Sequence, residues 1–152
     1  MKPWLEHLGL GRCPPFHRDP LFLAAIAAGA LFWLVLALAV KVPGRVPTWP
    51  ALVSLLLWQP TVEELLFRGV VQGELLARPF GARKMGPFSA ANVIASLAFA
   101  LIHFRHHPPL WAAAVFAPSL VFGLLRERHG CIWPALVLHI YYNSGYFLLF
   151  GA

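Results

Sequence analysis

Two adjacent glutamates and an arginine lie within a segment that is otherwise apolar: Glu63, Glu64 and Arg68. A charged side chain at the depth of a bilayer core costs at least about 2.5 to 3.5 kcal/mol on insertion scales, so such groups usually face a bundle interior and are paired or functional. Since the whole chain contains only six Asp and Glu residues, two of them at this depth indicate a buried site.

The spacing separates the two glutamates. On a helix, Glu64 and Arg68 are i and i+4 with the acid first, the order that favours an ion pair. Glu63 is turned about 100° away from Glu64 and cannot share that geometry equally well. We therefore predict a buried structural pair of Glu64 and Arg68. Glu63 is left as a carboxylate that needs partners from other helices.

Histidines supply the candidate partners, because only His103 and His139 of the seven histidines lie within apolar blocks. Phe99 comes one helical turn before His103, and Asn143 comes one turn after His139, so each pair shares a helix face. Three apolar segments thus each carry a polar position. We expect the bundle to bring these positions to Glu63.

The composition of the chain indicates the kind of fold that holds these polar residues together. Hydrophobic residues make up 59% of the 152-residue chain, only 12% are charged, and the mean hydropathy is +0.69. A soluble domain typically carries about twice that charged fraction. The apolar residues form blocks near or above the roughly 20 residues that cross a bilayer as a helix. We predict an all-α, polytopic transmembrane helical bundle of about five helices, with the active site inside it.

The predicted helices cover residues 21–40, 51–77, 88–104, 110–125 and 132–150. The first block is longer than the apolar region of a signal peptide, so we expect a retained helix. Pro118 is expected to kink the fourth block. The predicted organisation is a tail over 1–20, a first transmembrane helix over 21–40 and a four-helix core over 48–150.

The net charge of +6 is better explained by topology than by nucleic acid, because the basic residues lie mainly in short segments between apolar blocks. Eight lie on the side of the N-terminus and three on the other side: Lys2, Arg12, Arg18, Arg78, Arg83, Lys84, Arg126 and Arg128 against Lys41, Arg45 and Arg105. The positive-inside rule then predicts a cytoplasmic N-terminus.

Cys13 and Cys131 have no spacing typical of a disulfide framework or a metal site, and we expect two free thiols.

Three segments taken in order resemble a known family. "EELLFR", "FALIH" and "HIYYN" are similar to the EExxxR, FxxxH and HxxxN motifs of the CPBP family of intramembrane proteases, which includes type II CAAX prenyl endopeptidases and bacterial Abi-type proteins. Each motif alone is weak, but together they cover roughly residues 52–150. The resemblance implies a membrane-embedded endopeptidase of the glutamic type.

The resemblance also implies roles for individual residues. Glu63 and His103 would activate a water, with Glu63 as a general base. His139 and Asn143 would stabilise the oxyanion. The resemblance thus implies hydrolysis of a peptide bond without a serine or cysteine nucleophile. Glu64, Arg68 and Phe99 would have structural or orienting roles, and no cofactor would be required.

A metal is the principal alternative, because Glu63, His103 and His139 form the ligand set of some catalytic zinc sites. The chain contains no HExxH pair, and Asn143 makes better sense as an oxyanion donor than as a zinc ligand, so we favour the metal-free mechanism. Other classes remain open. A proton-coupled carrier would show ion flux that survives Asn143→Ala, and a haem protein would show a Soret band.

Size and layout resemble compact bacterial members of the family, including those associated with JDVT-type C-terminal sorting signals; bacteriocin self-immunity is the second role considered. We expect an integral protein of the bacterial inner membrane. The expected partners are the lipid bilayer and a protein or peptide substrate with a hydrophobic or C-terminal sorting segment. A prenylated substrate does not follow from the resemblance, and no nucleic acid is expected.

Overall fold

A computed structural model describes residues 3–39 and 48–150, and most of these residues are helical. The single helices are α1 (Pro3–His7), α2 (Pro20–Ala39), α6 (Ala90–His103), α7 (Pro109–Ala114), α8 (Phe116–His129) and α9 (Trp133–Phe150). One long helical run contains α3 (Trp49–Val53), the π-helical segment η1 (Ser54–Trp58), α4 (Gln59–Glu64), a second π-helical segment η2 (Leu65–Val71) and α5 (Gln72–Leu76). Strands β1 (Lys84–Met85) and β2 (Phe88–Ser89) form a small antiparallel hairpin.

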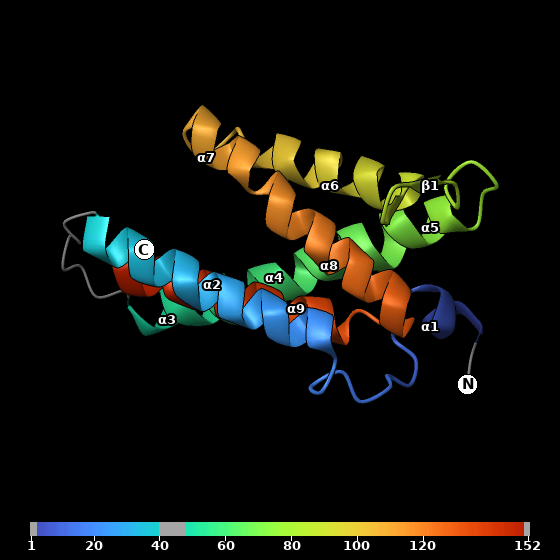
Figure 1. Cartoon of the computed structure of the whole chain (residues 1–152), viewed down its shortest axis with the longest axis horizontal. Helices are drawn as coiled ribbons and strands as arrows, with labels where there is room; N and C mark the ends of the chain where they lie inside the picture. The colour runs from blue at the N-terminus through green and yellow to red at the C-terminus, as the bar shows by residue number, and fades with distance from the viewer. Residues whose placement is uncertain (1–2, 40–47, 151–152) are drawn as a thin grey trace.

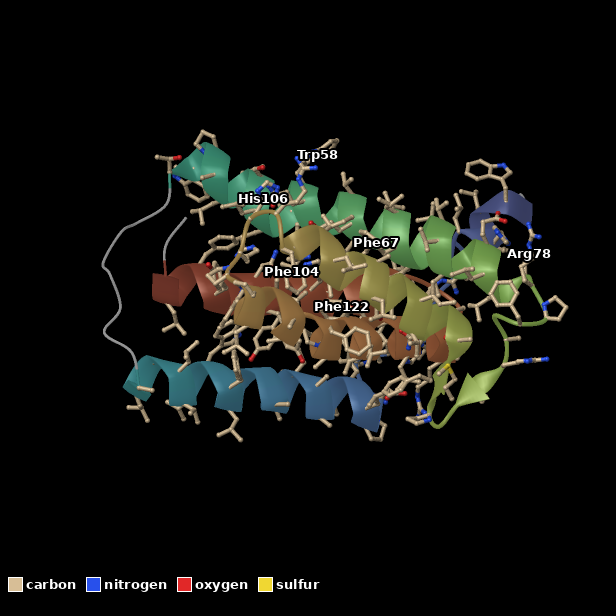
Figure 2. The ribbon with its side chains drawn as sticks, turned by 90° about the horizontal axis from the view of Figure 1, so that it is seen from above. Trp58, Phe67, Arg78, Phe104, His106 and Phe122 are labelled. Atoms are coloured by element: carbon tan, nitrogen blue, oxygen red, sulfur yellow. A yellow bond between two sulfur atoms is a disulfide. The ribbon has the colours of Figure 1, made fainter. Side chains whose placement is uncertain are left out.

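The helices form a bundle in which α6, α8 and α9 lie between α2 on one side and the long run α3 to α5 on the other (Figure 2). Helix α8 crosses the molecule diagonally and packs against both α6 and α9 (Figure 1). Part of the core joins α2, α8 and α9 through buried side chains: Phe22, Ala25, Phe122, Leu125, Ala135 and Leu138. Phe122 lies in the middle of the bundle, whereas Arg78 lies near the end formed by α5 (Figure 2).

Small and polar residues let α6 approach α8 closely. A Cβ at Gly123 would lie 2.0 Å from Oδ1 of Asn92. The Asn92 amide donates to the carbonyl of Leu120 at 3.0 Å, and its Oδ1 accepts from Ser96 at 3.1 Å. Small residues with interhelical hydrogen bonds are the usual means of close packing between apolar helices. This contact fixes α6, which carries His103, against α8.

All five predicted apolar blocks are mainly helical, but the third begins with strand β2 and becomes helical only at Ala90. The fourth divides at Val115 into α7 and α8, three residues before Pro118. Proline lacks an N–H, and its ring clashes with the carbonyl four residues earlier, here Ala114. The helix therefore breaks just before Pro118 and continues with Pro118 in its first turn.

Two helical stretches, Pro20–Ala39 and Pro109–His129, are long and apolar enough to cross a membrane. Val40, Lys41 and Arg45 lie outside the described residues.

The N-terminal tail folds back onto the bundle, which was not predicted. The guanidinium of Arg126 donates to the carbonyl of His7 at 3.0 Å, and the N–H of Ile132 donates to the carbonyl of Gly9 at 2.9 Å. The expectation of two free thiols is wrong, because Cys13 and Cys131 form a disulfide with their Cα atoms 5.6 Å apart. Their distance of 118 residues in sequence gave no indication that the docked tail would bring them together.

Asp19 connects this tail to two helices. Its carboxylate accepts from the backbone N–H groups of Leu21 and Phe22 and so caps the start of α2. It also pairs with Arg128 and lies 3.4 Å from Nε2 of His129. Desolvation would raise the pKa of Asp19, but the hydrogen bonds from Arg128 and from the two N–H groups outweigh it and hold the pKa below its ordinary value. The carboxylate therefore stays ionised at neutral pH.

The close approach at Gly123 is testable. We expect Gly123→Ala to destabilise the bundle by about 1 to 3 kcal/mol, because the added methyl group must displace the buried, hydrogen-bonded amide of Asn92. Ala117→Leu, on the exposed face of the same helix, is the control and should change little. Thermal unfolding in detergent, followed by circular dichroism, measures both. A midpoint for Gly123→Ala equal to that of the control would contradict the tight contact.

Candidate active site

Two π-helical segments flank the helix that carries the glutamates. In η1 the N–H of Gln59 donates to the carbonyl of Ser54, five residues earlier. The next carbonyl, that of Leu55, would need the N–H of residue 60, but Pro60 has none. Segments of this kind occur frequently at functional sites. Here they enclose α4, which ends in Glu63 and Glu64.

The predicted ion pair of Glu64 and Arg68 is present at the centre of the bundle. Nε of Arg68 lies 3.4 Å from Oε2 of Glu64, and both side chains are fully buried. Nη2 of Arg68 donates to the carbonyl of Ser119 at 3.1 Å and to its hydroxyl at 2.8 Å. The guanidinium also lies over the rings of Phe99 and Phe122, 5.3 and 5.8 Å from their centroids. Arg68 therefore ties the long helical run to α8.

His139 connects the two glutamates. Its Nδ1 is 2.9 Å from Oε1 of Glu64, and its Nε2 is 3.5 Å from Oε2 of Glu63. The ring stacks on Phe122 with centroids 5.1 Å apart. Since a carboxylate only accepts, Nδ1 carries the hydrogen in the bond to Glu64. Glu64 thus fixes the ring so that Nε2 faces Glu63, a contact across 75 residues of sequence that the spacing could not reveal.

Charge balance in this group requires one proton. With both glutamates ionised, Arg68 offsets only one of them. A single proton, held by Nε2 of His139 or by Glu63, makes the group neutral, which burial favours because an isolated charge is costly in an apolar interior. Glu63 is the more accessible carboxylate, since its side chain is 31% exposed and that of Glu64 is fully buried. The arrangement can therefore exchange a proton between Glu63 and His139 next to a surface open to a reactant.

His103 is part of a group of rings around Phe99. Its Nδ1 is 2.8 Å from the carbonyl of Phe99, so Nδ1 donates and Nε2 keeps its lone pair in the neutral ring. The Phe99 ring contacts both histidines, with centroids 4.6 Å from His103 and 5.7 Å from His139. Among the described residues, Glu63 has its polar contact with His139 and makes no direct hydrogen bond to His103. The predicted pairing of Glu63 with His103 therefore requires a water that bridges the two side chains.

Asn143 has a structural contact that sequence reasoning missed. Its Nδ2 donates to the carbonyl of Leu55 at 3.1 Å, the carbonyl that lacks a helix partner because of Pro60. One N–H of the amide is therefore used to complete the η1 segment. Asn143 lies one helical turn after His139 on α9, and its second N–H is the one that remains for a reactant. The proline was the sequence signal that could have indicated this role.

The alternative zinc set does not assemble as one centre. Within residues 3–39 and 48–150, no three His, Cys, Asp or Glu side chains are grouped so that they could hold a metal ion. Nδ1 of His139 and Nδ1 of His103 are each held by an acceptor, which leaves only their Nε2 atoms as ligands. These residues do not fit a three-ligand metal centre as they stand.

The comparison with protein families decides the identification. A family model described as type II CAAX prenyl endopeptidase, Rce1-like, matches residues 45–145. This chain belongs to that family. It is therefore a protease of the CAAX type, and all the motif residues discussed above lie within the matched region. Neither a curated protein nor a solved structure matches the chain.

The two glutamates of this CAAX-type protease should differ in their effect on stability. We expect Glu64→Gln to destabilise the fold by about 3 to 5 kcal/mol, because it removes the carboxylate that is paired directly with the buried guanidinium of Arg68. Glu63→Gln should cost much less, since Glu63 is partly exposed and has one long contact. Adding Arg68→Met to Glu64→Gln should recover part of the loss. Denaturant unfolding in detergent measures the stability of all three variants. Equal losses of stability in the two single variants would contradict the different structural roles of Glu63 and Glu64.

A second pair of substitutions isolates the structural contact of Asn143. Asn143→Ala should destabilise the protein by about 1 to 3 kcal/mol, because the carbonyl of Leu55 is left without a partner. Pro60→Ala in the same background should recover part of that loss, since alanine at position 60 supplies the missing N–H. Thermal unfolding of the single and double variants tests this. No recovery in the double variant would mean that Asn143 stabilises the fold by another contact.

Proposed function

We propose that this CAAX-type protease is a membrane-embedded endopeptidase that hydrolyses its substrate with a water activated by Glu63 and His103. The observation that carries the proposal is the imidazole of His139, held by the buried Glu64 at 2.9 Å with its other nitrogen 3.5 Å from Glu63. This arrangement puts a base and a proton donor side by side. The donor is fixed by groups that do not themselves react.

The proton balance of the reaction follows from this group. Glu63, as the ionised base, accepts a proton from the water as the oxygen attacks the carbonyl carbon of the peptide bond. Nε2 of His103 holds that water, and the protonated Nε2 of His139 donates to the oxyanion, assisted by the second N–H of Asn143. When the tetrahedral intermediate collapses, Glu63 returns the proton to the leaving amine. The site thus ends in its starting state.

The arrangement of apolar surface supports a polytopic membrane topology. Large apolar side chains of α2 are exposed, among them Leu31, Leu34 and Leu38 at 62%, 57% and 81%, as expected where lipid replaces water as the neighbour. The helical run over 49–76, at about 1.5 Å per residue, exceeds the roughly 30 Å of a hydrocarbon core. These features favour α2, the run 49–76, α6, the α7–α8 stretch and α9 as membrane segments.

Charge supports the proposed orientation. Lys84, Arg126 and Arg128 lie with the N-terminal tail at one end of the bundle, where they contact Glu127, the carbonyl of His7 and Asp19 respectively. By the positive-inside rule this end faces the cytoplasm. The bacterial inner membrane is the membrane we propose, from the resemblance of size and layout to compact bacterial members of the family.

The substrate we propose is a membrane-associated protein or peptide with a hydrophobic or C-terminal sorting segment. A site enclosed by apolar helices is reached most readily by a segment that itself partitions into the bilayer. The metal-free mechanism is the one proposed, because the two histidines and Glu63 do not form a three-ligand group. A zinc-dependent variant of the same hydrolysis would be inhibited by chelators.

The deciding experiment compares membrane proteins by mass spectrometry from cells that express the natural protein or Glu63→Gln. We expect an uncleaved precursor to accumulate with Glu63→Gln, with cleavage reduced at least about 10²-fold by loss of the general base. Glu74→Gln is the matched control, since Glu74 is exposed and pairs with His7 in the tail; it should leave cleavage unchanged. Normal processing by folded Glu63→Gln would disprove the proposal, and inhibition by a chelator would replace the metal-free mechanism.

A further inference from the structure

The connection between α5 and α6, residues 77–89, is a folded element at the end of the bundle that also carries α1 (Figure 1). The N–H of Gly81 donates to the carbonyl of Arg78 at 3.0 Å, and the N–H of Arg83 donates to the carbonyl of Phe80 at 3.2 Å. Strands β1 and β2 then pair within the same connection. These bonds turn the chain back on itself, so the loop 77–89 stays next to the two helices that it joins.

Glu127 of α8 holds this loop in place. Its Oε2 lies 3.1 Å from Nζ of Lys84, and its Oε1 accepts from the hydroxyl of Ser89 and from the amide of Gln72. The loop is thereby fixed to α8 and, through Gln72, to α5. A surface whose shape is set before a partner arrives loses less conformational entropy on binding.

The exposed side chains of the loop are cationic and apolar. Arg78 and Arg83 are exposed to solvent, and Phe80 and Met85 are 49% and 57% exposed. Apolar side chains next to basic ones are typical of segments that lie in the interface between water and lipid. A ligand that satisfies both kinds of side chain is itself anionic at one end and apolar at the other.

The positive charge of the two arginines is not compensated within the loop. Residues 77–89 contain no Asp or Glu. Lys84 is paired with Glu127 of α8, but in the part of the chain that the structure describes neither Arg78 nor Arg83 forms an ion pair. An anion from outside the protein therefore meets two guanidinium groups that have no internal competitor.

We propose that the loop 77–89 binds an anionic phospholipid, with Arg78 and Arg83 on the phosphate of the headgroup and Phe80 and Met85 between the acyl chains. The inference rests on the proposed membrane topology and concerns a surface to which no residue of the proposed catalytic group belongs. A guanidinium donates two parallel hydrogen bonds to a phosphate, which a lysine ammonium does not. Net negative charge on the lipid adds the attraction that basic segments have for anionic membrane surfaces.

The position of the loop favours a lipid over an acidic protein segment. Both neighbouring elements, the helical run 49–76 and α6, are proposed membrane segments, so a loop that folds back on them lies at the depth of the headgroups. An acidic peptide would pair with Arg78 and Arg83 but would leave Phe80 and Met85 without an apolar neighbour. A free phosphate ion would leave them in the same state.

Native mass spectrometry of the full-length protein in detergent tests lipid binding without a cleavage assay. The probes are phosphatidylglycerol, which is anionic, and phosphatidylcholine, which has the same phosphate but no net charge. We expect the natural protein to bind phosphatidylglycerol more tightly, and Arg78→Gln and Arg83→Gln each to lower that affinity by about fivefold. Arg105→Gln is the matched control, because Arg105 is exposed and follows the other end of α6; it should leave the affinity unchanged.

A second variant tests the apolar half of the surface. Phe80→Ser combined with Met85→Ser should weaken the binding of both lipids by a similar factor, because the acyl chains are the part that the two lipids share. Its preference for phosphatidylglycerol should remain, since both arginines are intact. A loss of that preference, with unchanged binding of phosphatidylcholine, would overturn the proposed insertion between acyl chains.

The remaining outcomes separate the lipid from other anions. Equal affinity of the natural protein for the two lipids, or an equal loss in Arg105→Gln and the two loop variants, would overturn the proposal. Displacement of phosphatidylglycerol by an equal concentration of inorganic phosphate or of an acidic peptide would also overturn it, in favour of a free anion or a protein partner. Selective lipid binding by a protein that cleaves no substrate would support the loop and contradict only the protease mechanism.

Discussion

The buried carboxylate of Glu64 is the interaction on which the site depends. One of its oxygens faces Arg68 and the other faces His139, so this single group connects the long helical run to α9. Through Arg68 it also reaches Ser119 on α8. Buried charges are costly unless they are paired and hydrogen-bonded. The bond from Nδ1 of His139 to Glu64 meets part of this requirement and holds the imidazole in one orientation.

That constraint assigns different tasks to two adjacent residues. Glu64 is buried, pairs with Arg68 on one side and is hydrogen-bonded to His139 on the other, and so it positions His139. Glu63 is turned toward a partly open region, where it faces the free nitrogen of the same ring. The aromatic rings of Phe99 and Phe122 cover the charged groups, and exclusion of water strengthens the electrostatic interactions within the group. In the proposed mechanism the reacting carboxylate is therefore Glu63, which has fewer contacts with the rest of the fold than Glu64.

Sequence reasoning recovered what depends on helical periodicity and missed what depends on contacts between helices. The apolar blocks and the i, i+4 pair of Glu64 and Arg68 could be predicted because both follow from local geometry. The contact of His139 with Glu64 and the docking of the tail link distant segments, and local spacing does not encode them. The structural contact of Asn143 lies between these two cases, because part of its cause is local. Its bond to Leu55 compensates for the missing N–H of Pro60, which is visible in the sequence once the π-helical segment is known.

In the proposed mechanism, water attacks the peptide bond directly while Glu63 acts as a base. Cleavage of the precursor in ¹⁸O-labelled water containing hydroxylamine tests it most directly, with the new carboxyl terminus analysed by mass spectrometry. Direct attack predicts one ¹⁸O atom in the released carboxylate and no hydroxamate. A hydroxamate product, or ¹⁸O recovered in the side chain of Glu63, would indicate a covalent acyl-enzyme and contradict the account.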